Sequence, residues 1–169
     1  MGWINIRAAS TNSGAISDMS QASSKGTGAR TRARELLLQA LYQKQIAGHG
    51  KSELLQQFHE QLAYQRVDQE LFDEHLVAIC DAQATLEAAI EAFVDRPLAQ
   101  LDPVELSILL IGTYELQSRI DVPYKVVINE CVNLARRFGS TDGHKYINAC
   151  LDVAAHSLRK IEVQANAGG

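Results

Sequence analysis

The segment LDPVELSILLIGTYEL, residues 101–116, carries the clearest secondary-structure signal in the chain. Asp102 stands at a helix N-cap position, and Pro103 follows at the first helical position, where a missing N–H is tolerated. Glu105 comes three residues after the cap, in a capping-box arrangement. Apolar side chains then recur with helical spacing at Leu106, Leu109, Leu110, Tyr114 and Leu116. The segment therefore predicts a helix that begins at Pro103.

The helical pattern extends to both sides of this segment. It covers residues 30–47, residues 52–64, a long stretch from Asp68 to Arg96, a stretch from Asp121 to Gly139 and a last stretch from Asp142 to Leu158. Gln83 interrupts the apolar stripe of the longest stretch and predicts a break or bend there. We expect at least six helices and no strand.

Composition supports an all-α fold and argues against other classes. Gly112 is the only glycine between residues 51 and 138, so the turn signals that β-hairpins need are almost absent. No run approaches the roughly 18 consecutive apolar residues of a membrane span. The opening residues MGWINIR lack the basic and apolar regions of a secretory signal. These features predict a cytoplasmic protein.

The two ends of the chain differ from its middle. Residues 1–28 are rich in Ser, Gly, Ala, Thr and Asn, without sustained periodicity, and predict a disordered, flexible N-terminal arm, although Met19 could also initiate the chain. Residues 161–169 end in Ala-Gly-Gly and predict a frayed C-terminal tail. A single helical domain is expected over residues 29–160.

Motifs for catalysis or metal binding are missing from the sequence. Cys80, Cys131 and Cys150 have none of the close spacings of zinc or redox motifs and are expected to be free thiols in the core. The five histidines form no pair with metal-ligand spacing, and no phosphate-binding glycine loop or nucleophile elbow occurs. We therefore expect no metal, no cofactor and no enzymatic activity.

Charge is distributed unevenly along the chain. Its net charge is −4, but residues 1–52 carry seven basic and two acidic residues, residues 53–105 two and twelve, and residues 106–169 seven and six. Such a chain can present one face to anions and another to cations. The alternative is that the acidic side chains only keep helix surfaces solvated.

Several strings, in a fixed order, resemble a known family. They are RARE at 32–35, QALY at 39–42, LDPVE at 101–105, YEL at 114–116, DVPYKVVINE at 121–130, LA at 134–135, FG at 138–139, HKYIN at 144–148 and LD at 151–152. Together these strings resemble the NusB family of bacterial transcription antitermination factors, from Arg30 to about Arg159. The first 28 residues, Thr31 within the arginine cluster, Gly143 and Ala149 depart from the common pattern of that family.

The resemblance implies a NusB-like helical fold of two packed three-helix-type subdomains. It also implies a non-enzymatic role, in which the protein binds the boxA sequence of nascent RNA together with the small-subunit ribosomal protein NusE. That complex helps RNA polymerase to pass terminators, chiefly in ribosomal RNA operons. Some members of the family are thought to dimerise and hide the RNA face, so a homodimer is one state that the resemblance allows.

Arg30, Arg32 and Arg34 form the candidate basic strip for RNA. On a helix, Arg30 and Arg34 share a face while Arg32 points elsewhere, and a frayed first turn would let all three converge on a phosphate backbone. Positive charge at a helix N-terminus opposes the helix dipole, which favours a binding role over a stabilising one. Their planar guanidinium groups suit phosphate oxygens and base stacking. The alternative is a solvated helix face.

The turn that precedes the last helix holds the second group of candidates. By the resemblance, Asp142, Lys145 and Tyr146 contact RNA, because reading single-stranded RNA requires an aromatic surface together with hydrogen-bonding groups. Asp142 can instead be a plain N-cap, and Tyr146 a core aromatic residue. Arg136 and Arg137 could extend the basic surface or only stabilise a helix C-terminus.

The resemblance also implies a surface for NusE. Tyr42, Val104 and Glu105 are the expected contacts, and the acidic stretch 53–105 complements a basic ribosomal protein. The string at 124–130 is instead expected to be scaffold, with Asn129 and Glu130 tying helices together.

Two other interpretations stay open. NusB-like domains also precede the catalytic domain of some ribosomal RNA cytosine methyltransferases, but we expect no methyl-donor-binding domain here, because only about ten residues follow the last expected helix. The second alternative is a helical protein-interaction module without RNA binding.

Overall fold

The computed structural model describes residues 26–168, and every regular element within that range is helical. The helices are α1 (Thr27–Ala47), α2 (Lys51–His59), α3 (Gln69–Asp81), α4 (Gln83–Glu91), α5 (Pro103–Ser118), α6 (Tyr124–Phe138), α7 (Gly143–Leu158) and α8 (Lys160–Ala167). Two short 3-10 helices, η1 (Leu62–Arg66) and η2 (Leu98–Gln100), lie between them. The predicted all-α class is confirmed.

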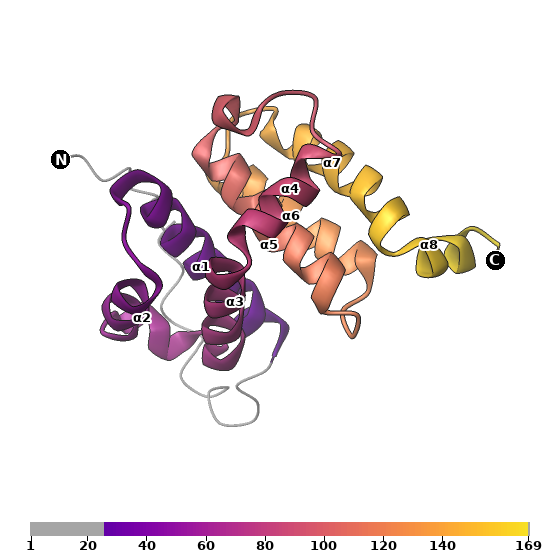
Figure 1. The fold of residues 1–169 in the computed structure, drawn as a ribbon. Helices are drawn as coiled ribbons and strands as arrows, with labels where there is room; N and C mark the ends of the chain where they lie inside the picture. The colour runs from indigo at the N-terminus through magenta and orange to yellow at the C-terminus, as the bar shows by residue number, and fades with distance from the viewer. Residues whose placement is uncertain (1–25, 169) are drawn as a thin grey trace.

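The helices form two packed groups, as the resemblance implied (Figure 1). The first group consists of α1, α2 and α3, and the second of α5, α6 and α7, with α4 leading from one to the other and packing on α5. Both α1 and α3 also contact α5, so α5 is the helix that both groups share.

The sequence of α5 explains its central place. Most of its side chains are buried, because apolar residues surround the helix rather than forming a single stripe. A methyl group at Gly112 would lie 2.9 Å from both Cδ atoms of Leu151 in α7 and 3.1 Å from Sγ of Cys131 in α6. The missing side chain therefore allows three helices to approach one another at this point.

Two helix starts are capped by an aspartate side chain. The Asp102 Oδ1 atom accepts a hydrogen bond from the backbone N–H of Val104 at 2.8 Å, and Asp68 accepts one from Leu71 at 3.1 Å. The break expected near Gln83 is confirmed, since α3 ends at Asp81 and α4 begins at Gln83.

Several predicted boundaries were wrong, among them the end of the long stretch, since α4 ends at Glu91 rather than near Arg96. The first helix begins at Thr27, inside the expected arm, and residues 1–25 of that arm lie outside the described residues. The helix expected over 52–64 ends at His59, and η1 follows it. The expected C-terminal tail instead forms α8.

Arg159 explains why the chain continues as a helix beyond α7. Its guanidinium is buried and donates to the carbonyl oxygens of four residues at the end of α5 and in the following loop, at 2.6–3.0 Å: Glu115, Leu116, Arg119 and Val122. It also pairs with Glu162 at 2.6 Å, whose carboxylate accepts a hydrogen bond from the N–H of Tyr124 at 3.0 Å. The start of α8 therefore caps the C-terminus of α5 and the N-terminus of α6.

Replacing Arg159 by alanine is expected to lower the free energy of unfolding by about 3 kcal/mol or more, because several buried carbonyl groups lose a charged donor. Urea unfolding followed by circular dichroism measures this loss. Lys160→Ala removes a neighbouring exposed cation and is expected to change the unfolding free energy by less than about 0.5 kcal/mol. Equal stability of the two variants would contradict the capping role of Arg159.

Candidate nucleic-acid interface

Side chains at the start of α1 contact the middle and the C-terminal end of α6. The Thr31 hydroxyl is 3.2 Å from both carboxylate oxygens of Glu130 in α6, to which it donates. One helical turn further on, Glu35 forms an ion pair with Arg137 near the end of α6. These contacts hold the first turns of α1 alongside the helix that leads into the turn before α7.

Two of the three predicted arginines are exposed at this end of α1. Both Arg30 and Arg32 lie on the surface. The Nε atom of Arg32 donates to the backbone oxygen of Arg66 at 3.0 Å, which joins α1 to η1 and leaves the rest of the guanidinium at the surface. The helical start that the structure shows separates these side chains, so the convergence expected from a frayed first turn does not occur.

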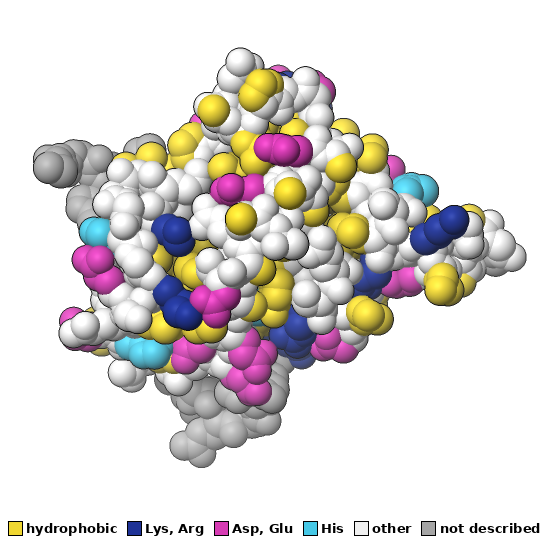
Figure 2. Space-filling view, viewed as in Figure 1, with side chains coloured by type: hydrophobic (Ala, Val, Ile, Leu, Met, Phe, Trp, Pro, Cys, Tyr) yellow, Lys and Arg dark blue, Asp and Glu magenta, His cyan; other side chains and the backbone are white. Residues whose placement is uncertain are grey.

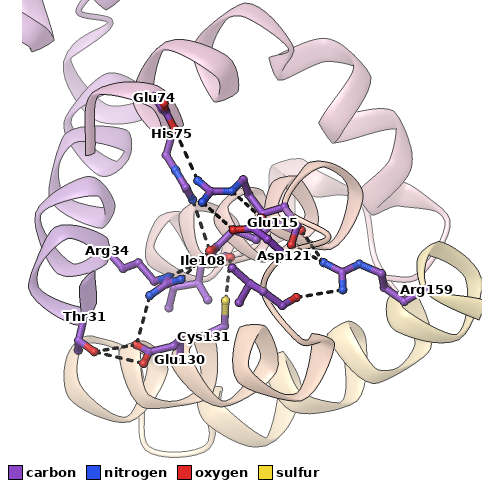
Figure 3. Close-up of polar contacts among 12 residues, drawn as sticks. Thr31, Arg34, Glu74, His75, Ile108, Glu115, Asp121, Glu130, Cys131 and Arg159 are labelled. Carbon is purple, nitrogen blue, oxygen red and sulfur yellow. Dashed lines mark hydrogen bonds and ion pairs between the residues drawn. The ribbon is translucent and has the colours of Figure 1, made fainter. Parts of the chain in front are cut away.

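Arg34 is a correction to the predicted strip, because its side chain is directed into the core. It is only 3% exposed, and its guanidinium donates two hydrogen bonds to the Glu115 carboxylate in α5, at 2.9 and 2.7 Å (Figure 3). Glu130 lies 4.0 Å away on the other side. Arg34 therefore joins α1 to α5 and has no surface to offer to a phosphate group.

The surroundings of Glu115 keep it ionised. Burial raises its pKa, but Arg34 and the buried His75 outweigh that effect and lower the pKa of Glu115 to about 2. The His75 Nε2 atom lies 3.4 Å from the carboxylate, an electrostatic contact rather than a hydrogen bond. Two buried charges thus satisfy each other across the boundary between the two groups of helices.

The turn before α7 presents Asp142 to solvent, and the first turn of α7 presents Lys145. Both side chains are mostly exposed, and they form an ion pair of 3.3 Å across the first turn of the helix. Asp142 stands at the N-cap position of α7, as the alternative expected, but its side chain accepts no hydrogen bond from the backbone of that helix. Both groups remain accessible from outside.

Tyr146 lies on a different side of α7. Its hydroxyl donates to Asp95 at 3.1 Å, and the Arg96 guanidinium covers one face of its ring, 4.6 Å from the ring centre. Burial, the contact with Cys150 and the bond to Asp95 raise the pKa of the Tyr146 phenol. The ring therefore faces the loop that follows α4 and does not face α6.

A polar pocket that the sequence analysis missed lies between α6 and α7. Its volume is about 660 Å³, and it is lined by Asn129, Val132, Asn133, Arg136, His144, Lys145 and Asn148. Asn129, Asn133 and Arg136 are four and three residues apart, which is the spacing of one helix face. That spacing is the signal in the sequence. The expectation that Asn129 ties helices together is wrong, because its side chain forms no hydrogen bond within residues 26–168.

The predicted residues for a protein partner lie where α1 meets the start of α5. Gln45 donates to the Pro103 carbonyl at 3.0 Å and to the Ser107 hydroxyl at 2.6 Å, and the partly buried Tyr42 precedes it by one turn. Val104 is only 7% exposed, so little of its side chain is available to a partner.

Glu105 does not complete the predicted capping box. Its carboxylate lies beside Gly143 at the start of α7, within 3.2 Å of where a β-carbon would stand on that glycine. Burial and the nearby charge of Asp102 raise the pKa of Glu105. The residue is partly exposed and links the start of α5 to the turn before α7.

Other kinds of site find no support in the described part of the chain. Among those residues, no group of three His, Cys, Asp or Glu side chains could hold a metal ion. Cys131 and Cys150 are buried free thiols and Cys80 is a partly buried one. No helix between residues 26 and 168 has the length and apolar character needed to cross a membrane.

Arg34→Ala is expected to lower the free energy of unfolding by about 3–5 kcal/mol, because it leaves the Glu115 carboxylate buried and unpaired. Urea unfolding at neutral pH checks this value. Arg32→Ala is the matched control, with an expected loss below about 1.5 kcal/mol for its one hydrogen bond. A stable Arg34→Ala protein that had lost only RNA affinity would instead support an RNA contact.

The ion pair also predicts acid sensitivity. The folded pKa of Glu115, about 2, lies below its ordinary value of 4.5. Its stabilising effect is therefore complete above pH 4.5 and is lost as the pH falls toward 2. The double variant Arg34→Met/Glu115→Leu is expected to fold and to lose less unfolding free energy between about pH 5 and pH 2.5. An unchanged pH dependence would contradict the assignment.

Comparisons with known proteins agree on one family. The model of the NusB family matches residues 31–156. The chain is 48% identical over 142 residues to "Transcription antitermination protein NusB" of Hahella chejuensis, which covers 84% of this chain and 95% of that protein. It is 45% identical over 143 residues to the protein of the same name from Pseudomonas syringae pv. tomato, with 84% and 87% covered. The solved structure of T. maritima NusB has a TM-score of 0.69 at 23% identity, covers 80% of this chain and 96% of that one, and shows the shared fold. The chain belongs to the NusB family, in which both of these relatives are transcription antitermination proteins.

Proposed function

We propose that this protein binds boxA-containing single-stranded RNA together with the ribosomal protein NusE, and that it acts in transcription antitermination in ribosomal RNA operons. The observation that supports this most is the attachment of α1 to α6 by the Thr31–Glu130 and Glu35–Arg137 contacts. It holds the exposed arginines at the start of α1 next to the helix that ends in the turn of Asp142 and Lys145. An RNA strand that crosses α6 would contact both the arginines of α1 and the side chains of Asp142 and Lys145.

The charge of this surface favours binding with a partner over binding alone. With Arg34 buried, Arg30 and Arg32 are the exposed arginines at the start of α1, and Lys145 adds a cation on the other side of α6. Three phosphate contacts on single-stranded RNA give a salt dependence with a slope of only about −2. A second protein that adds contacts would supply the missing affinity.

The acidic part of the chain supports a basic partner. Figure 2 shows acidic side chains spread over the face formed by α2, α3 and α4, with fewer basic side chains dispersed among them. This face includes most of the stretch 53–105, which carries twelve acidic and two basic residues. Tyr42 and Glu105 are the proposed contacts at its edge, both partly exposed.

The proposed role involves binding and no catalysis. Along α6 and the start of α7, exposed amides, Arg136 and Lys145 can recognise bases and phosphates, and the buried charged pair of Arg34 and Glu115 is used in holding helices together. Since its RNA and RNA polymerase meet during transcription, we propose that the protein works in the cytoplasm as part of the antitermination complex.

Filter binding of boxA RNA and of a scrambled RNA, with and without NusE at one salt concentration, tests the proposal. We expect the mixture with NusE to retain boxA RNA in preference to the scrambled RNA. Failure of both the protein and the mixture to discriminate would reject RNA reading. Binding to NusE without any RNA preference would favour the alternative of a helical protein-interaction module.

The double variant Arg30→Ala/Arg32→Ala is expected to weaken boxA binding and to make the plot of log affinity against log salt shallower by about 1.4, which corresponds to two lost phosphate contacts. Fluorescence anisotropy over a salt series measures the slope, and NusE binding is expected to be unchanged. Lys160→Ala on α8 is the matched control for loss of an exposed cation. An unchanged slope in the double variant would place the RNA elsewhere.

A further inference from the structure

The pocket between α6 and α7 contains polar groups that the protein itself does not use. Within residues 26–168, the side chains of Asn129, Asn133, Arg136 and Asn148 form no hydrogen bond or ion pair with another protein group. Three other arginines differ from Arg136, since Arg34, Arg137 and Arg159 each pair with a carboxylate. Hydrogen-bond donors and acceptors are therefore concentrated here although the fold does not use them.

The lining residues are chemically complementary to a nucleotide. A carboxamide offers a donor and an acceptor side by side and matches the edge of a base, whereas arginine and lysine match phosphate oxygens. Val132 contributes a mostly buried apolar patch on which the face of a base could rest. No acidic side chain lines the pocket, so a phosphate group meets no repulsion from the lining itself and a metal ion would find few ligands.

The size and place of the pocket agree with this chemistry. A volume of about 660 Å³ lies within the usual range for small-molecule sites, about 300–1,000 Å³. Asn129 is adjacent in sequence to Glu130, the residue that holds Thr31 at the start of α1. Lys145 belongs both to the pocket and to the turn that was predicted to contact RNA. A strand that leaves the start of α1 across α6 would therefore reach the pocket.

We propose that the α6–α7 pocket binds one unstacked ribonucleotide, with its base read by the asparagine amides and its phosphate held by Arg136 and Lys145. This inference rests on the proposed RNA-binding function and extends it, because it assigns a base-reading site to residues outside the basic strip. The nucleotide comes from the RNA strand beside the boxA core, and a free mononucleotide would satisfy the same chemistry.

The test compares three RNAs by fluorescence anisotropy in the presence of NusE: the boxA core alone, and the core extended by a few unpaired nucleotides at its 5′ or 3′ end. We expect one extension to raise the affinity of the unaltered protein by about fivefold or more. Asn133→Ala/Asn148→Ala is expected to abolish that gain and to leave binding of the core unchanged. Asn166→Ala, an exposed asparagine on α8, is the matched control and should keep the gain.

A second measurement uses AMP and UMP as probes, with the side-chain amide NMR signals of Asn133 and Asn148 as the readout. Shifted signals without a gain from either extension would support the pocket as a site for a free nucleotide. No gain and no shift would overturn the inference. If neither the protein nor its mixture with NusE preferred boxA RNA to the scrambled RNA, the proposed function would fail by a separate result, while the mononucleotide titration would still decide on the pocket.

Discussion

The buried ion pair between Arg34 and Glu115 is the constraint on which the arrangement of the two helix groups depends. Removing two charges from water is costly, and their mutual attraction offsets that cost only when both partners are in place. Here the pairing is bidentate, and the carboxylate also faces His75 from α3. A shift of α1 along α5 by one helical turn would separate the charges. The pair therefore sets the register of α1 against the central helix.

That register determines which arginines reach the surface. Arg30 precedes Arg34 by one turn on the same side of α1, and this step of about 6 Å carries the side chain from the core to the exposed end of the helix. The same register brings Thr31 to Glu130 and Glu35 to Arg137. As a result α6, which packs on α5 and α7, is also joined to the start of α1 by side-chain contacts, and the candidate groups lie on either side of it.

Much of the fold could be predicted because its signals are local, whereas part of the site could not. The Asp102 cap, the interruption near Gln83 and the apolar stripes act within a few residues and were visible in the sequence. The sequence predicts an RNA contact for Arg34 because nothing local distinguishes a buried arginine from an exposed one. Its actual partner, Glu115, lies 81 residues away. Similarly, Arg159 contacts backbone carbonyls about 40 residues away, so the helix it begins was expected to be a tail.

By itself the sequence determined the all-α class, most of the helix boundaries and the charge asymmetry, since helical periodicity and capping depend on neighbours along the chain. Only the tertiary structure decided the fate of each charged side chain: Arg34 inside, Arg32 outside, Arg159 at the end of α5, and Arg136 in a pocket with three asparagines. The physical reason is that burial and ion pairing depend on which helices meet. Residues far apart in the sequence determine which helices meet, as in the close approach of helices at Gly112 and the ion pair between Arg34 and Glu115.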